Sequence, residues 1–204
     1  MDDWKKALKK VWFFIWEDDS IWSWLVNLIL AFVLIKFIVY PGLGFMLSTT
    51  HPVVAVVSES MEHGSNFDDW WSRSGGGYTE NGIDKETFKK FSLRNGFNKG
   101  DIMLLKGKKP EKIGIGDVIV FWSAKRDPII HRVVKTWESG GVHYFQTKGD
   151  NNPGSLKTPS VDETMISQDS VVGNAVFRIP LLGWVKIIAV KIWDITLGFI
   201  LQKG

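Results

Sequence analysis

The chain begins with one long apolar segment, and shorter apolar runs follow it. The segment at residues 22–40 contains two strongly polar side chains, Asn27 and Lys36. As an α-helix it would rise about 28 Å, which is close to the ~30 Å hydrocarbon thickness of a bilayer. Pro41 and Gly42 then predict the end of the helix. The pattern therefore predicts a transmembrane anchor.

A cleaved secretory signal peptide is the alternative interpretation of this segment. Such a peptide has a shorter apolar region close to the N-terminus, followed by small residues at the cleavage site. Here a polar and aromatic stretch, residues 1–21, precedes the apolar segment. We therefore expect an anchor that remains attached.

After the anchor, short runs rich in valine, isoleucine and aromatic residues recur, with glycine, proline or asparagine between them. Such runs predict the strands of a mainly antiparallel sheet. The expected strands cover residues 53–57, 102–105, 118–122, 129–136, 142–147 and 171–177.

One internal segment departs from this strand pattern. Residues 63–99 are rich in serine, glycine, asparagine and aspartate, and they contain the adjacent pair Trp70 and Trp71. We expect an inserted excursion from the sheet, with a short helix over residues 84–92 that is capped by Asp84. It forms either a plain solvent loop or a segment that contacts membrane or substrate through its tryptophans.

The C-terminal stretch is apolar again. As a helix, residues 180–201 would gather Lys186, Lys191 and Asp194 in one arc and leave a broad apolar face. Such a helix either lies in the membrane interface or spans the bilayer. The predicted division of the chain is an N-terminal segment, a transmembrane anchor, an extracytoplasmic β-rich domain with an insertion and a C-terminal membrane-associated helix, at residues 1–21, 22–40, 41–179 and 180–204.

Charge and composition add an orientation and exclude several classes of protein. Four lysines precede the anchor, at positions 5, 6, 9 and 10, so the positive-inside rule predicts a cytoplasmic N-terminus. A net charge of +3 with no dense basic tract argues against nucleic acid as a partner. The absence of cysteine excludes a thiol nucleophile, a thiolate metal site and disulfides.

Two serines follow the first predicted strand, in the run Ser58-Glu59-Ser60-Met61. The strand period of two places Ser58 and Ser60 on one face. A serine becomes a nucleophile when a base takes its proton, and a second hydroxyl beside it could hold a developing oxyanion. Serines at strand ends also serve as capping groups, so the pattern alone leaves both roles open.

His131 and Asp150 are candidate partners for these serines. His131 lies in a strongly β-favouring run, and the ordinary pKa of imidazole, about 6.5, suits a general base. A lone histidine in a strand can equally be structural. Asp150 follows a later strand, where it could orient an imidazole or form an Asx-type turn.

Together these motifs resemble a type I signal peptidase of the archaeal and endoplasmic-reticulum branch. The resemblance runs from the apolar segment to about Pro180. In chain order it comprises Ser58-Glu59-Ser60-Met61-Glu62, Lys99-Gly100-Asp101-Ile102, Ile115-Gly116-Asp117-Val118-Ile119, Ile130-His131-Arg132-Val133 and Thr147-Lys148-Gly149-Asp150-Asn151-Asn152. It implies a mainly β fold: a coiled antiparallel sheet forming a signal-peptidase-like catalytic domain, with an N-terminal transmembrane helix and an apolar C-terminal helix.

The resemblance also implies roles for the candidate residues. Ser60 is the expected nucleophile, Ser58 helps to form the oxyanion hole, and His131 is the base where the bacterial branch has lysine. The family commonly places a further aspartate shortly after Gly-Asp-Asn-Asn, as the third catalytic member. This chain has no acid there, and the next one is Asp162. We therefore expect Asp162, ahead of Asp150, to orient His131.

The implied function is a membrane-bound serine endopeptidase that removes signal peptides from exported preproteins after small residues, with no metal or cofactor. The expected partners are signal peptides of secretory preproteins, the lipid bilayer and the translocation machinery, in the cell membrane or the endoplasmic-reticulum membrane. One alternative is a non-catalytic, membrane-tethered β-domain that binds export substrates or partners. A self-processing peptidase of the repressor type is another, but the anchor and the histidine argue against it.

Overall fold

The computed structural model describes residues 3–185, 187–188 and 191. The chain divides into two compact units, Met1–Met46 and Leu47–Gly204. Most of the predicted C-terminal helix at 180–204 lies outside the described residues. The two units are taken in turn below.

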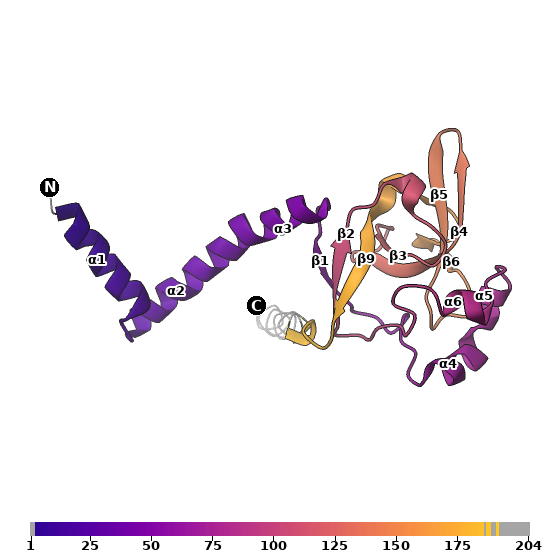
Figure 1. The fold of residues 1–204 in the computed structure, drawn as a ribbon, viewed down its shortest axis with the longest axis horizontal. Helices are drawn as coiled ribbons and strands as arrows, with labels where there is room; N and C mark the ends of the chain where they lie inside the picture. The colour runs from indigo at the N-terminus through magenta and orange to yellow at the C-terminus, as the bar shows by residue number, and fades with distance from the viewer. Residues whose placement is uncertain (1–2, 186, 189–190, 192–204) are drawn as a thin grey trace, which may run out of the picture. The chain divides into compact units, whose positions relative to one another are not determined.

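The first unit is helical. Helix α1 covers Asp3–Trp16, and α2 (Ile21–Leu34), the π-helical turn η1 (Ile35–Val39) and α3 (Tyr40–Leu47) follow as one continuous helix (Figure 1). This helix, Ile21–Leu47, has 27 residues and is long and apolar enough to cross a membrane. Asn27, a polar residue within it, donates to the Ile15 carbonyl at 2.8 Å. It thereby satisfies one of the carbonyls that the end of α1 leaves free.

The helix does not end at Pro41, where the sequence pattern predicts its end. Proline has no N–H, and its ring clashes with the carbonyl four residues earlier in a regular α-helix. The π-helical turn immediately before it changes the hydrogen bonding, since the Tyr40 N–H bonds to Ile35, five residues back. Pro41 is the second residue of α3, so its missing N–H falls directly after this turn, where the hydrogen-bonding pattern has already shifted.

The second unit is built on an antiparallel sheet with the strand order β1-β2-β9-β3-β4-β5-β8 (Figure 1). All six predicted strands are present. Their bounds are Val53–Ala55 for β1, Ile102–Lys106 for β2, Val118–Phe121 for β3, Ile129–Ser139 for β4, Val142–Lys148 for β5 and Val171–Ile179 for β9. Three short strands were not predicted: β6 (Lys157–Thr158), β7 (Val161–Asp162) and β8 (Ile166–Ser167). The first two pair only with each other.

The sheet curls so that both of its faces are covered by apolar side chains. Register shifts occur in the β2–β9, β3–β9 and β4–β5 pairings, and such irregularities bend strands and increase their twist. On β3 the alternating residues belong to different clusters. Val118 and Val120 pack in one, and Ile119 and Phe121 pack in the other. This two-sided burial explains why β3 is a continuous apolar run rather than an alternating one.

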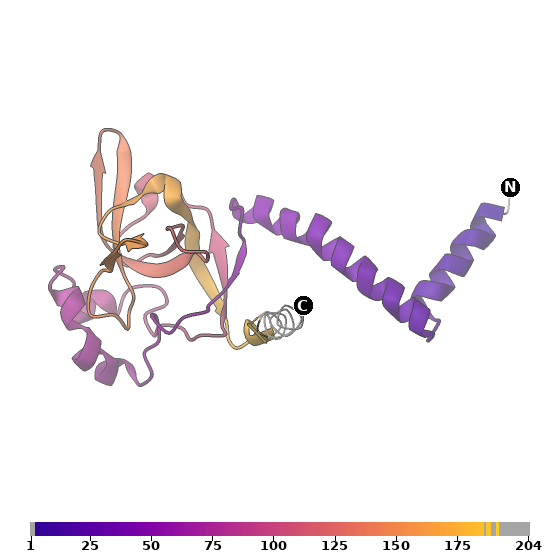
Figure 2. The same ribbon diagram turned by 180° about the vertical axis from the view of Figure 1, so that it is seen from behind.

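The 63–99 segment folds into short helices rather than a solvent loop. Helices α4 (Phe67–Ser74), α5 (Gly76–Thr79) and α6 (Lys85–Phe88) lie together at one side of the sheet (Figures 1 and 2). Trp70 is fully buried in the aromatic cluster that joins these helices to Val134 of β4. The expectation that both tryptophans face membrane or substrate is therefore wrong for Trp70, whose ring stabilises the insertion.

Candidate active site

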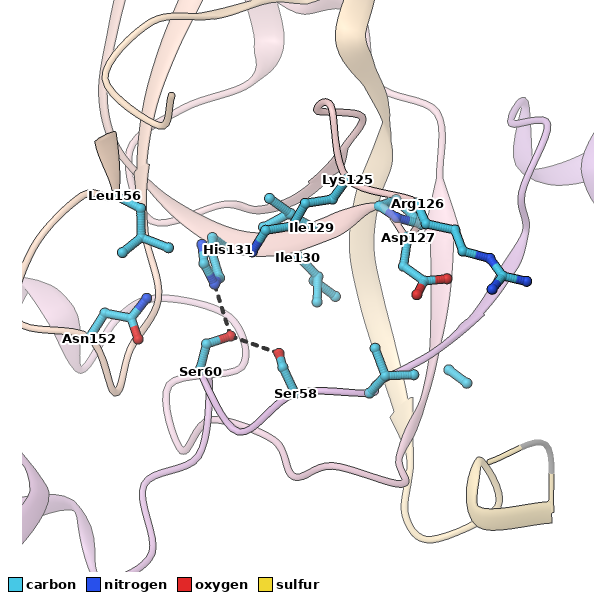
Figure 3. Close-up of a pocket in the computed structure, with 13 residues that line it drawn as sticks. Ser58, Ser60, Lys125, Arg126, Asp127, Ile129, Ile130, His131, Asn152 and Leu156 are labelled. Atoms are coloured by element: carbon cyan, nitrogen blue, oxygen red, sulfur yellow. Dashed lines mark hydrogen bonds between the residues drawn. The ribbon is translucent and has the colours of Figure 1, made fainter. Parts of the chain in front are cut away.

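The two serines and the histidine lie together in the wall of one pocket. Ser60 lies in the turn after β1, and its carbonyl accepts from the Asn151 N–H at 2.8 Å. The Ser60 Oγ lies 2.8 Å from Nε2 of His131 on β4 (Figure 3). The predicted nucleophile and base are thus within hydrogen-bonding distance, the geometry that allows an imidazole to remove a hydroxyl proton.

Ser58 lies beside this pair. Its Oγ is 3.1 Å from the Ser60 Oγ, on the side away from the imidazole (Figure 3). Ser58 is exposed and Ser60 is half-buried, so both hydroxyls are open to a bound molecule. A substrate carbonyl attacked by Ser60 would place its oxygen within reach of this second donor.

A buried carboxylate completes the chain of hydrogen bonds, and it belongs to Glu163. One of its oxygens contacts Nδ1 of His131 and accepts from the Thr147 hydroxyl at 2.8 Å. The other accepts from the Leu156 N–H at 2.7 Å. Because a carboxylate on Nδ1 favours the tautomer with its proton there, Nε2 is left free to accept from Ser60.

Neither predicted aspartate contacts His131. Asp162 is exposed, and it accepts from the Thr164 N–H at 2.9 Å and the Thr164 hydroxyl at 2.5 Å. Alternation along the chain explains the difference, because Val161 and Glu163 are buried while Asp162 between them faces solvent. The carboxylate at His131 is therefore one residue beyond the predicted one. Val161 was the available signal, since an apolar residue at 161 marks 163 as also facing inward.

Asp150 is fully buried in a different network. It forms an ion pair with Arg132, whose Nη2 lies 2.9 Å from Oδ2, and it also bonds to His63 and Tyr78. Burial by itself raises the pKa of Asp150, but Arg132 together with the bonds from His63 and Tyr78 outweighs burial and keeps this pKa well below its usual range. Asp150 is thus a permanently ionised partner of Arg132.

Gly149 explains the close approach of the 149–152 turn to the two reacting side chains. A Cβ at this position would lie 2.9 Å from Nε2 of His131 and 2.8 Å from the Ser60 carbonyl oxygen. Real side chains essentially never approach so closely, so a glycine is required here. The Gly-Asp-Asn-Asn motif therefore contributes a tight contact at 149 and a buried anion at 150.

Lys148 is the buried amine nearest to this turn in sequence. Burial lowers its pKa to about 8. Its ammonium donates to the Gly149 carbonyl at 3.0 Å and lies 4.2 Å from the centre of the Tyr78 ring. Its hydrogen bonds go to the main-chain carbonyls of Gly149 and Asp150, whereas His131 bonds directly to Ser60. The geometry therefore favours His131 over Lys148 as the base.

A pocket of about 530 Å³ opens beside the two serines (Figure 3). Apolar side chains form much of its wall, and Arg126 and Asp127, from the segment before β4, lie at the end away from His131. The apolar group is Ala55, Val57, Ile129, Ile130 and Leu156, and the charged group is Lys125, Arg126 and Asp127. Within the described part of the chain, no group of three His, Asp or Glu side chains is arranged to bind a metal ion.

Comparison with known proteins finds relatives that are named as catalytic subunits of the signal peptidase complex. No family model matches the chain. The signal peptidase complex catalytic subunit SEC11 of Colletotrichum graminicola is 31% identical over 100 residues, which are 48% of this chain and 58% of the relative. SEC11C of Homo sapiens is 36% identical over 103 residues, 48% of this chain and 52% of the relative.

A third relative, SEC11 of Pyricularia oryzae, is 28% identical over 99 residues, 47% of this chain and 58% of the relative. The chain thus spans about half the length of the curated relatives that it matches. It has homologues named as catalytic subunits of the signal peptidase complex, which confirms the resemblance inferred from its motifs.

Proposed function

We propose that this chain is a membrane-bound serine endopeptidase that removes N-terminal signal peptides from exported preproteins. The observation that carries the proposal is the hydrogen-bonded series Ser60–His131–Glu163 beside a pocket. The names of the homologues support the same activity. The rival, a tethered domain that binds without cleaving, gives no reason for a buried carboxylate on the far nitrogen of an imidazole that contacts a serine.

The proposed reaction proceeds through an acyl-enzyme. The Ser60 oxygen attacks the scissile carbonyl as Nε2 of His131 takes its proton, and Glu163 balances the imidazolium that forms. Ser58 and a main-chain N–H stabilise the oxyanion. The imidazolium then gives its proton to the leaving amine as the C–N bond breaks. Water, deprotonated by His131, hydrolyses the ester and restores Ser60.

The proposed substrate is an extended peptide that ends in small side chains at the cut. Strand β1 is at the edge of the sheet, so its outer side can pair with an added strand. Side chains of the peptide would then enter the apolar pocket, where Val57, Ile130 and Leu156 limit the space. This matches the small residues that precede the cleavage site of signal peptides.

The proposed location is a membrane, with helix Ile21–Leu47 as the anchor. The lysines before it support a cytoplasmic N-terminus, with the sheet domain on the other side of the membrane. Because the homologues are named as subunits of a complex, we propose that partner subunits and the translocation machinery contact this chain.

The test uses the full chain, solubilised in detergent, with a preprotein as substrate. Wild type should cleave, and Ser60→Ala and His131→Ala should each lower kcat by about 10⁴-fold or more. Asp162→Asn is the control, because its exposed side chain has polar contacts with Thr164 of its own turn and with Lys157, and none with His131 or Ser60. Binding of the preprotein by wild type without cleavage would instead establish the non-catalytic rival.

A further inference from the structure

In the ion pair between Arg132 and Asp150, every N–H donor of the guanidinium has an acceptor. An arginine has five N–H donors. Here Nε and one Nη2 donor bond to Asp150 at 3.0 and 2.9 Å, and one Nη1 donor bonds to the Gly116 carbonyl at 3.0 Å. The remaining two donors need acceptors from outside the sheet.

Those acceptors, and two donors to the carboxylate, come from the 63–99 segment. The carbonyls of Ser92 and Leu93 accept from the guanidinium at 2.8 and 3.0 Å. His63 Nε2 and the Tyr78 hydroxyl donate to the two carboxylate oxygens at 3.0 and 2.5 Å. The insertion therefore completes the hydrogen bonding of both charges, and these charges would be costly to bury without it.

This buried pair is adjacent in sequence to the groups that hold the proposed reacting atoms. Arg132 follows His131 on β4. Asp150 lies between Gly149, whose main chain packs against the imidazole, and Asn151, whose N–H bonds to the Ser60 carbonyl. A shift of the Asp150 carboxylate therefore moves the turn that contacts both Ser60 and His131.

We propose that the 63–99 insertion sets the alignment of Ser60 with His131 through Asp150, with Tyr78 and His63 as positioning residues. The inference rests on the proposed peptidase function. Neither side chain is among the residues that line the pocket, so neither touches the substrate. Their effect is transmitted by the carboxylate to the 149–151 turn.

The two positioning side chains are suited to this role because each keeps its donor in place. Tyr78 is fully buried, and burial together with the Asp150 charge raises its pKa well above the ordinary value, so its hydroxyl stays protonated. His63 stacks on Trp70 with ring centres 3.6 Å apart and planes at 3°. That stacking directs Nε2 at the carboxylate.

The experiment measures kcat and KM of the solubilised full chain with a preprotein, for Tyr78→Phe and for two replacements of His63. Tyr78→Phe keeps the ring in its aromatic cluster and removes one donor. His63→Phe keeps the stacking surface and loses the donor, whereas His63→Gln keeps a donor. Tyr144→Phe is the matched control, since the half-buried Tyr144 ring stacks on Trp137 and its hydroxyl has no hydrogen bond among the described residues.

Tyr78→Phe and His63→Phe should each lower kcat about tenfold and change KM less than twofold. His63→Gln should recover part of the loss, and Tyr144→Phe should remain within twofold of wild type. The double variant Tyr78→Phe with His63→Phe should lose less than the product of the single losses, because both act on one carboxylate.

Three results would overturn the inference. In the first, kcat of Tyr78→Phe and His63→Phe stays within twofold of wild type. In the second, the loss disappears when rates are divided by the folded fraction, which would make the role purely structural. In the third, the single losses multiply in the double variant. Failure of the proposed function gives a different pattern, in which Ser60→Ala still cleaves whatever Tyr78→Phe does.

Discussion

Two buried carboxylates lie close to His131, and the difference between their partners separates their roles. Glu163 accepts from uncharged donors, the Thr147 hydroxyl and the Leu156 N–H, and contacts the imidazole. Asp150 is paired with the guanidinium of Arg132. A carboxylate beside a permanent cation has little attraction left for a second one, whereas Glu163 can balance a charge that appears on His131 during reaction.

The comparison also shows that burial does not identify the residue that assists catalysis. Both carboxylates are fully buried, and each follows a strand: Asp150 comes after β5 of the seven-stranded sheet, and Glu163 comes after β7 of the two-stranded sheet. The roles separate because His131 and Arg132 are neighbours on β4, and neighbouring side chains on a strand point to opposite faces. Glu163 is therefore on the His131 face, and Asp150 is on the Arg132 face with the insertion.

The sharpest way to break this comparison is Glu163→Gln. The amide can present an N–H to Nδ1, which favours the tautomer with the proton on Nε2, the nitrogen that must accept from Ser60. We expect kcat for preprotein cleavage to fall by about 10⁴-fold with the fold retained. Asp162→Asn in the same assay should stay within twofold of wild type. Equal losses in the two variants would remove Glu163 from the proposed site.

The next largest effect is expected for Asp150→Asn, which should lower the free energy of unfolding. Removing one partner leaves Arg132 buried without its counter-charge, which costs about 3–5 kcal/mol. Thermal unfolding of the solubilised chain, followed by circular dichroism, measures the loss. The matched control is Asp68→Asn, which removes an exposed pair with Lys85 and should leave thermal unfolding close to that of wild type. A loss as small as the control's would mean that Asp150 is not the partner on which Arg132 depends.

Lys148 allows a pH test, because burial lowers its pKa more than the neighbouring Asp150 raises it. Its pKa is about 8 in the folded chain, against about 10.4 when unfolded. Between these values the unfolded state binds more protons, so the free energy of unfolding rises with pH. Relative to Lys148→Met, wild type should gain about 2 kcal/mol from pH 8 to pH 10. A difference that does not change with pH would contradict the lowered pKa.

The smallest expected effect concerns the turn that joins the two carboxylate regions. Gly149→Ala would place a methyl group against Nε2 of His131 and the Ser60 carbonyl, so we expect kcat to fall about tenfold. Gly154→Ala is the control, because nothing lies within 4 Å of the added Cβ there. Equal kcat in the two alanine variants would show that the turn can move without disturbing Ser60 and His131.

Much of the fold was predictable from local pattern. The six longer strands are apolar runs between turn residues, and each lies where it was predicted. The short strands β6, β7 and β8 were not, since two residues are too few to produce a periodic signal. The short helix predicted at 84–92 is present as α6, with Asp84 as its N-cap. Helices α4 and α5 were missed in the rest of the 63–99 segment. Its serine and glycine content indicates a loop, and the aromatic cluster that orders it includes Val134, distant in sequence.

The sequence by itself determined the apolar anchor, the strands, and the pairing of Ser60 with His131, because these depend on periodicity and on motifs. Only the tertiary structure decided which acid contacts His131. Asp150, Asp162 and Glu163 all carry a carboxyl group, but the fold directs their side chains to different surroundings. One faces Arg132, one faces solvent, and one faces the imidazole. Charge is a property of a residue, whereas its partner is a property of the fold.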